Sequence, residues 1–230
     1  MITNRKGILI MFQYVLFDLD GTLTDPKIGI TSCVQYALAD AGIDEPNLDK
    51  LEPFIGPPLV DSFRDFYGFD DEQIQRAIAK YHERFDHIGI YENEMIEGIP
   101  ELLQALKDDQ RKVAIASSKP KPLVVRILEH FKIAQYFDTV VGSEFDGRFA
   151  TKEAVVEEAI RQLVSADYKK EDVAMVGDRK FDIQGAKAHG LTGIGVSFGY
   201  AGEHELEDAG ADYVVDTVEE LQRLLLQGSL

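Results

Sequence analysis

The sequence predicts an α/β protein in which a parallel sheet is flanked by helices and an additional helical segment is inserted after the first strand. From about residue 99 onward, short apolar runs alternate with segments of helical periodicity. An earlier apolar run, Tyr14 to Phe17, stands far upstream of this alternation. Continuous apolar strands that alternate with helices are typical of a parallel sheet covered on both faces.

The first strand is expected over "YVLF", residues 14–17, and it runs directly into Asp18. The stretch that follows is much longer than the single helix needed to cross to the next strand. Its pattern is helical, because apolar side chains recur at helical spacing over residues 72–88. These side chains are Ile74, Ile78, Tyr81, Phe85 and Ile88.

The remaining elements follow in regular alternation. Helices are predicted over residues 99–109, 122–131, 152–164, 181–190 and 218–227, and strands over residues 112–117, 137–143, 173–178, 192–197 and 211–216. The helix at 99–109 can serve as the first crossover. We therefore expect a core domain of residues 12–23 and 99–230, a helical cap domain of residues 24–98, and an N-terminal extension of residues 1–11.

Composition narrows the set of partners. The chain of 230 residues has 41 acidic and 24 basic residues, a net charge of −17, which argues against nucleic acid and anionic membranes as partners. No apolar run approaches the length that a bilayer requires. The one cysteine, Cys33, excludes an intramolecular disulfide and fits a reducing compartment. We expect a cytoplasmic monomer or homodimer.

Polar side chains stand where three predicted strands end. Asp18 ends the first strand, Ser117 and Ser118 end the second, and Asp178 ends the strand at 173–178. Ligands of open parallel sheets bind at the carboxyl ends of the strands, so these side chains are expected in one crevice. Asp20 lies two residues after Asp18, on the same side of an extended chain. Because two adjacent carboxylates do not both ionise easily, the pair predicts one nucleophile and one proton carrier.

A second acidic pair, Asp178 and Asp182, is four residues apart at the start of a predicted helix, where this spacing brings both toward one side. Three or four oxygen donors of this kind suit Mg²⁺, and no cluster of cysteine or histidine favours a softer metal. The sequence therefore predicts a magnesium site. Because the molecule has a large negative charge, it needs cations near the site in order to bind an anion.

These motifs resemble those of a known family. "DLDGT", the strand-ending "ASSK", Lys152 and "GDRKFD" are similar, in order and spacing, to the four motifs of the haloacid dehalogenase-like superfamily. "GPPL", "SSKP" and "GDRKFDI" resemble its phosphoglycolate phosphatase-like branch, which includes 5'-nucleotidase members. The resemblance implies a Rossmann-like core with a helical cap. It also implies a Mg²⁺-dependent phosphatase that hydrolyses a small phosphorylated metabolite, phosphoglycolate-like or a nucleoside 5'-monophosphate, through an aspartyl-phosphate.

The resemblance also implies catalytic roles. Asp18 is the expected nucleophile, and Asp20 is expected to protonate the leaving group and then to activate water. Asp18, the backbone carbonyl of Asp20, and Asp178 are the expected metal ligands. Asp182 is expected to orient the metal shell, and Lys152 to bridge Asp18 and the phosphate.

The same resemblance assigns phosphate contacts to Ser117 and to the backbone N–H groups near Gly21 and Ser118. Lys119, directly after the second motif, is a further candidate for phosphate binding.

Two alternatives remain open at this point. One is a phosphotransferase of the β-phosphoglucomutase kind, which shares the same core. The other is a non-catalytic module that uses an aspartyl-phosphate as a switch. The presence of Asp20 favours hydrolysis, since a switch gains from losing the base that promotes dephosphorylation.

Overall fold

The computed structural model describes residues 12–144 and 148–228, which form two compact units. The first unit contains the chain up to Leu23 and again from Met95, and the second contains Thr24–Glu94. The expected N-terminal extension, residues 1–11, lies outside the described residues. Residues 95–98, predicted to belong to the inserted segment, lie in the first unit. The backbone explains this difference, because Ile96 N donates a hydrogen bond to Leu23 O at 3.2 Å.

The first unit is built on a six-stranded sheet with the strand order β5-β4-β1-β6-β7-β8. Every pair of neighbouring strands in it is parallel. The strands are β1 (Tyr14–Phe17), β4 (Lys112–Pro120), β5 (Thr139–Ser143), β6 (Val173–Gly177), β7 (Thr192–Val196) and β8 (Tyr213–Val215). The predicted parallel sheet is thus confirmed, and β1, which precedes the inserted segment, lies at its centre between β4 and β6.

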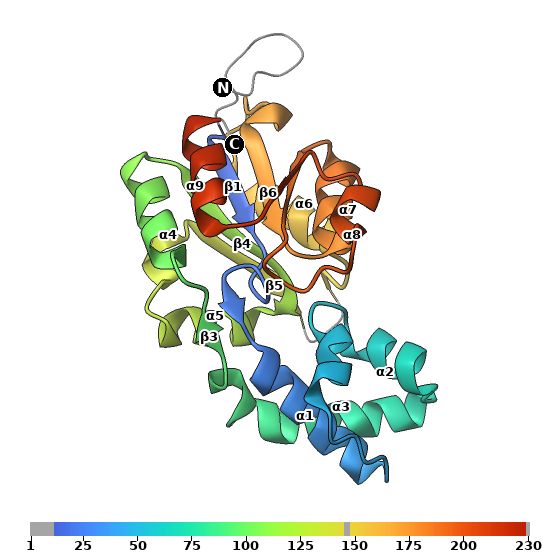
Figure 1. Ribbon diagram of the computed structural model, residues 1–230. Helices are drawn as coiled ribbons and strands as arrows, with labels where there is room; N and C mark the ends of the chain where they lie inside the picture. Colours follow the sequence, from blue (N-terminus) through green and yellow to red (C-terminus); the bar gives the residue numbers. More distant parts are fainter. Residues whose placement is uncertain (1–11, 145–147, 229–230) are drawn as a thin grey trace. The chain divides into compact units, whose positions relative to one another are not determined.

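Helices cover both faces of this sheet, as the apolar character of its strands requires. In Figure 1, α4, α5 and α9 lie on one face, and α6, α7 and α8 lie on the other. Their bounds are α4 (Ile99–Asp108), α5 (Lys121–His130), α6 (Lys152–Leu163), α7 (Lys180–His189), α8 (Glu205–Asp208) and α9 (Val218–Gln227), with short 3-10 helices at Ala134–Tyr136 and Lys170–Asp172. The short helix α8 has no counterpart among the predicted elements.

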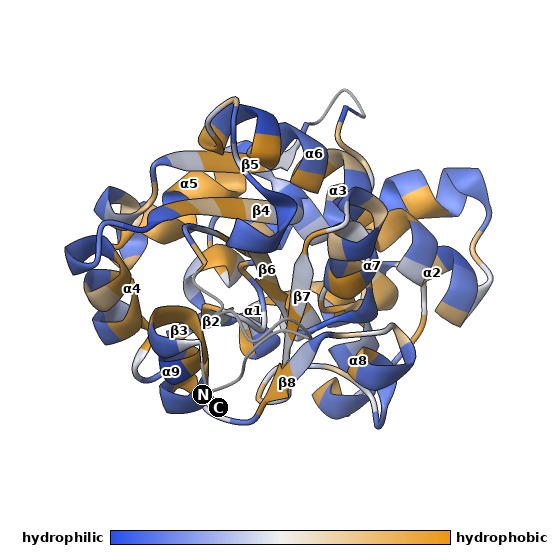
Figure 2. Ribbon diagram, turned by 90° about the horizontal axis from the view of Figure 1, so that it is seen from above, coloured by the Kyte–Doolittle hydropathy of each residue, from blue (hydrophilic) through white to orange (hydrophobic). Residues whose placement is uncertain are grey.

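The core of this unit lies between the sheet and its helices. Leu16 of β1 and Met175 of β6 pack with Val155 and Val156 of α6 in one fully buried cluster. Figure 2 shows β4 and β6 as largely hydrophobic, while the helices are hydrophobic on one side and hydrophilic on the other. Burial of this apolar surface fixes the sheet and therefore the positions at which its strands end.

The second unit is helical. It contains α1 (Lys27–Asp40), α2 (Leu59–Tyr67) and α3 (Asp71–Phe85), the 3-10 helices η1 (Leu48–Phe54) and η2 (Gly89–Tyr91), and β2 (Thr24–Asp25), which pairs with β3 (Glu94–Met95). Helix α3 begins after a capping box in which Asp70 Oδ1 accepts a hydrogen bond from Gln73 N at 2.9 Å. The predicted apolar face extends too far, because α3 ends at Phe85 and Ile88 is 53% exposed.

Among the described residues, no helix is long and apolar enough to cross a membrane.

Candidate active site

Asp18 is fixed at the end of the central strand. Its backbone N–H donates to Val176 O at 2.9 Å, so the pairing between β1 and β6 continues to the aspartate itself. The chain then turns at Gly21, whose φ of 78° lies in the left-handed region that glycine adopts without strain. A Cβ at this glycine would lie 2.1 Å from Asp178 Oδ2. The absence of a side chain at Gly21 therefore lets this turn lie directly against Asp178.

Asp178 follows β6 and is fully buried. Its Oδ1 accepts a hydrogen bond from Thr22 Oγ1 at 3.1 Å, and its Oδ2 accepts one from Tyr200 N at 2.8 Å. Burial, followed by the nearby charges of Asp182 and Asp18, raises the pKa of Asp178 well above its ordinary value. A cation beside Asp178 would stabilise its ionised form and so offset the effect of burial on the pKa.

Asp182 lies in the first turn of α7 and is also fully buried. Its Oδ2 accepts a hydrogen bond from Arg179 N at 3.0 Å, which satisfies a backbone donor at the start of the helix. Gly177 leaves room for this carboxylate, since a Cβ there would lie 2.1 Å from Asp182 Cγ. Burial raises the pKa of Asp182 to about 6, although the charge of Lys152 acts in the opposite direction.

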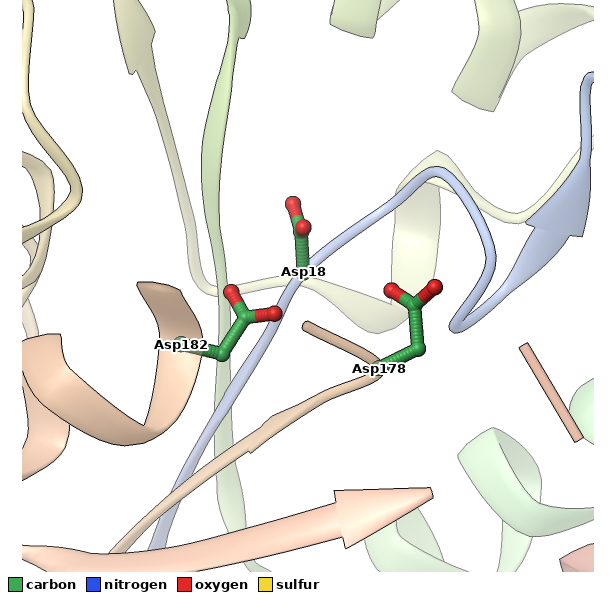
Figure 3. A group of neighbouring side chains, drawn as sticks. All are labelled: Asp18, Asp178 and Asp182. Carbon is green, nitrogen blue, oxygen red and sulfur yellow. The ribbon is translucent and has the colours of Figure 1, made fainter. Parts of the chain in front are cut away.

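The carboxylates of Asp18, Asp178 and Asp182 form one group. Each offers an oxygen, and the three oxygens lie within 4.8 Å of one another. Figure 3 shows the side chains together: Asp18 after β1, Asp178 after β6, and Asp182 on α7. Asp18 Oδ1 is buried and accepts no hydrogen bond from the described residues. Three buried carboxylates of this kind fit a hard divalent cation that prefers oxygen ligands.

Lys152 supplies the one ammonium group that contacts these carboxylates in the described chain. Its Nζ lies 3.0 Å from Asp18 Oδ2 and 2.8 Å from Asp182 Oδ1, and it donates a hydrogen bond to Ala116 O at 3.1 Å. Burial alone would lower the pKa of Lys152, but the charges of Asp18 and Asp182 outweigh burial and hold the pKa above its usual range. Lys152 is therefore charged at neutral pH.

The position of Lys152 follows from local sequence. Thr151 caps α6, since its side chain accepts a hydrogen bond from Ala154 N at 3.3 Å, so Lys152 is the first residue of the helix. Gly185 of α7 gives the lysine stem room, because a Cβ there would approach Lys152 Cγ to 3.0 Å.

Asp20 lies outside the group of three carboxylates. Its Oδ2 is 2.7 Å from Lys119 Nζ, and both side chains are nearly buried. Burial raises the pKa of Asp20 above its ordinary value, although Lys119 lowers it. Asp20 Oδ1 is buried and accepts no hydrogen bond from the described residues. Lys119, a further candidate for phosphate binding, thus forms an ion pair with the predicted proton carrier.

The predicted phosphate-binding hydroxyl belongs to Ser117, which is buried at the end of β4. Its Oγ accepts a hydrogen bond from Lys119 N at 3.3 Å. The carbonyl of Ser118 accepts a hydrogen bond from Ser143 Oγ at 2.8 Å, which ties the end of β4 to β5. These contacts fix the end of β4, on which the phosphate contacts of Ser117 and Ser118 are predicted, while Gly21 lies in the turn after β1.

Two supports of Asp178 were not predicted from the sequence. Thr22 belongs to the quoted motif "DLDGT", and its buried hydroxyl is accounted for by the hydrogen bond that it donates to Asp178. The other support, the backbone N–H of Tyr200, left no signal, because every residue type except proline supplies such a donor.

Comparison with known proteins gives consistent results. A family model for haloacid dehalogenase-like hydrolases matches residues 15–196. A 5'-nucleotidase of Pseudomonas aeruginosa is 46% identical over 202 residues, which cover 87% of this chain and 90% of the relative. The tyrosine-protein kinase PtkA of Mycobacterium tuberculosis is 37% identical over 216 residues, covering 93% of this chain and 72% of the relative.

Among solved structures, a predicted phosphatase from Clostridium acetobutylicum superimposes with a TM-score of 0.87 at 45% identity. The match covers 93% of this chain and 97% of that chain. Both the fold class and the superfamily expected from the four motifs are confirmed. The chain therefore belongs to the haloacid dehalogenase-like hydrolase family.

Proposed function

We propose that the protein is a Mg²⁺-dependent phosphatase that hydrolyses a small phosphomonoester through an aspartyl-phosphate on Asp18. The observation that carries the proposal is the environment of the Asp18 carboxylate. Its Oδ2 is held by Lys152, while its Oδ1 is buried without a hydrogen bond from the described residues. A nucleophile needs this combination of fixed orientation and one unengaged oxygen.

In the first step, Asp18 Oδ1 attacks the phosphorus in line with the ester oxygen. A bond forms between the aspartate oxygen and phosphorus, and the bond from phosphorus to the ester oxygen breaks. Asp20 gives its proton to the departing alkoxide. Burial raises the pKa of Asp20 above its ordinary value, which favours the protonated form that this step requires.

In the second step, Asp20 is ionised and takes a proton from water, whose oxygen attacks the phosphorus. Phosphate leaves, and the Asp18 carboxylate is regenerated. Lys119, 2.7 Å from Asp20 Oδ2, holds the carboxylate of Asp20 in one orientation through both steps. Lys152 places a positive charge beside Asp18, where the transferred phosphoryl oxygens carry negative charge.

Asp18 and Asp178 would hold the magnesium ion together with the backbone carbonyl of Asp20, and Asp182 would orient this group from α7. When bound, Mg²⁺ supplies charge neutralisation to the phosphoryl oxygens. These ligands fit Mg²⁺ because they are all oxygen atoms. The group also contains three carboxylates and only one contacting ammonium group, that of Lys152, among the described residues, so a cation would be attracted to it.

The substrate class that we favour is the nucleoside 5'-monophosphates. The support is the P. aeruginosa relative, which is named a 5'-nucleotidase and is 46% identical over most of both chains. Phosphoglycolate-like substrates are the other class that the motifs "SSKP" and "GDRKFDI" favour.

The relative PtkA supports a second candidate, which is phosphoryl transfer to a tyrosine side chain. The two functions differ in the acceptor. Hydrolysis places the phosphoryl group on water, whereas a kinase moves it from a nucleoside triphosphate to the tyrosine hydroxyl.

The test measures phosphate release from nucleoside 5'-monophosphates, phosphoglycolate, sugar phosphates and pyrophosphate, with Mg²⁺ and with excess EDTA. A parallel reaction contains ATP and a tyrosine-containing polypeptide. Metal-dependent release from the monophosphates supports the proposal. Transfer to tyrosine without release from any monophosphate favours the second candidate. Release that is equal in EDTA contradicts the magnesium requirement.

A further inference from the structure

The loop of residues 197–204, between β7 and α8, lies against the Asp178 carboxylate. Tyr200 N donates a hydrogen bond to Asp178 Oδ2 at 2.8 Å. Gly199 approaches the same aspartate so closely that a Cβ would lie 2.3 Å from Asp178 Cβ and 2.4 Å from Gly21 O. The backbone of this loop is therefore one wall of the proposed metal site. A small displacement of the loop would move a donor away from Asp178.

One carboxylate holds this loop in place. Glu205 Oε2 accepts a hydrogen bond from Gly202 N, inside the loop, at 3.1 Å. Glu205 Oε1 accepts two more, from Lys180 N at 2.8 Å and from Arg179 Nε at 3.0 Å. These three donors come from two separate segments, so the carboxylate joins the loop to the first turn of α7.

The Glu205 side chain is only 15% exposed, and that of Arg179 is 13% exposed, so water screens the pair weakly. Burial by itself would raise the pKa of Glu205. The hydrogen bond from Lys180 N, that from Arg179 and that from Gly202 N outweigh burial and hold the pKa below its ordinary value. Glu205 is therefore ionised at neutral pH, when its acceptor capacity is greatest.

The first turn of α7 is also where Asp182 is held. Arg179 N donates to Asp182 Oδ2 at 3.0 Å, while Arg179 Nε donates to Glu205. Glu205 therefore contacts the supports of two metal-site carboxylates, Asp178 through the loop and Asp182 through Arg179. Groups that orient metal ligands in this way commonly change metal affinity by 10- to 100-fold when removed.

We infer that Glu205 is a positioning residue for the metal site, which it organises by clamping the 197–204 loop to the start of α7. The inference deepens the proposed function and rests on it, since it assumes that the three carboxylates bind a divalent cation. Glu205 contacts neither the cation nor the substrate in this account. Its contribution is the orientation of Asp178 and Asp182.

The test compares Glu205→Ala and Glu205→Gln with the control Glu203→Ala. Glu203 is in the same loop, with a side chain that is 91% exposed. Titration calorimetry with MgCl₂ measures metal binding without substrate, and thermal unfolding in EDTA verifies that each variant is folded. We expect Glu205→Ala to weaken Mg²⁺ binding about 10- to 100-fold, and Glu203→Ala to bind like the wild type.

Glu205→Gln separates positioning from folding, because its amide oxygen can still accept from Lys180 N and Arg179 while its amide nitrogen cannot accept from Gly202 N. We expect a smaller loss than in Glu205→Ala. The Mg²⁺ concentration for half-maximal turnover should rise in both variants, with an unchanged substrate KM and kcat restored at saturating metal. If Glu205→Ala does not fold, Glu205→Gln carries the comparison.

Equal Mg²⁺ affinity in the wild type and in folded Glu205 variants overturns the positioning role and leaves the proposed phosphatase intact. A wild-type protein that binds no Mg²⁺ overturns both this inference and the metal site of the proposed function. A folded Glu205→Ala variant with a lower kcat at saturating metal and an unchanged Mg²⁺ affinity also overturns the inference, because it places the effect on the reaction and not on the metal.

Discussion

Replacement of Lys152 by methionine tests how much the positive charge of Lys152 stabilises the group of buried carboxylates. Methionine fills most of the space of the buried lysine stem but removes the ammonium group. The substitution deletes the contacts of Nζ with Asp18 Oδ2 at 3.0 Å, Asp182 Oδ1 at 2.8 Å and Ala116 O at 3.1 Å. The carboxyl groups of Asp18, Asp178 and Asp182 would then have no ammonium group in contact with them among the described residues. Removal of one partner from a buried ion pair costs about 3–5 kcal/mol of unfolding free energy.

The cost should depend on pH. The pKa of Lys152 is raised in the folded protein, so Lys152 is charged throughout the range from pH 5 to pH 8, and the pH dependence comes from the carboxyl groups. The pKa of Asp182 is about 6 with Lys152 present and should rise further without it. A raised carboxyl pKa gives stability that is present at low pH and is lost as pH rises through the folded pKa. The variant should therefore be most destabilised near pH 8.

Urea unfolding in EDTA at pH 5 and pH 8 measures this cost, with Lys187→Met as the control. Lys187 Nζ lies 2.7 Å from Asp212 Oδ1, but both side chains are 39% exposed, so loss of this pair should cost less than about 1 kcal/mol. The expected cost is contradicted if the unfolding free energy of Lys152→Met at pH 8 is within about 1 kcal/mol of that of the Lys187→Met control, which is the upper limit for an exposed pair.

Three further predictions follow. Asp20→Asn should slow the hydrolysis of alkyl phosphates about 10²- to 10⁴-fold, because their leaving group needs a proton. The variant should still release a stoichiometric burst of nitrophenolate from 4-nitrophenyl phosphate, whose leaving group needs no proton. Equal losses of rate on both substrates in stopped-flow assays would contradict this role of Asp20. Because the pKa values of Asp178 and Asp182 are raised, the metal-free protein should lose stability as pH rises through about 6. Mg²⁺ should therefore increase the Tm more at pH 7.5 than at pH 5. An increase in Tm that does not depend on pH would argue against metal binding by these carboxylates. Gly177→Ala should abolish most Mg²⁺ binding in calorimetry, because the added Cβ would lie 2.1 Å from Asp182 Cγ. The control Gly193→Ala should bind Mg²⁺ like the wild type, because its added Cβ would have its nearest neighbours at 3.5 Å. Equal Mg²⁺ affinities of the two variants would show that Asp182 is not needed.

Much of the fold was predictable because its elements are marked by local patterns. The strands of the sheet are apolar runs, and the helices between them carry apolar side chains at helical spacing, so the order of elements follows from the sequence alone. The proximity of Asp18 and Asp178 was predictable for the same reason. Asp18 and Asp178 directly follow two of these strands, and parallel strands end at a common edge.

Contacts made by loops and by the backbone were not predictable. The donor to Asp178 Oδ2 is the N–H of Tyr200, which carries no information about residue type. Glu205 lies in a four-residue helix that is too short to show a periodic pattern. The pairing of Lys119 with Asp20 depends on how the end of β4 lies beside the turn after β1, a tertiary arrangement that neither motif contains by itself.

The apolar face predicted for α3 included Ile88 because the periodic spacing continues past the end of the helix. The helix stops at Phe85, and the chain enters η2 soon afterward. Periodicity identifies the helix, but it does not determine where the helix ends.

Asp18 is the proposed acceptor of the phosphoryl group. The most direct measurement stops turnover with acid within the first catalytic cycle and maps phosphorylation within residues 14–25 by mass spectrometry, in the wild type and in Asp18→Asn. We expect a phosphoryl group on Asp18 that disappears when unlabelled substrate is added in excess, and no phosphorylation or turnover in Asp18→Asn. Rapid turnover by a folded Asp18→Asn variant, or a phosphoryl group on another residue, would contradict this role of Asp18.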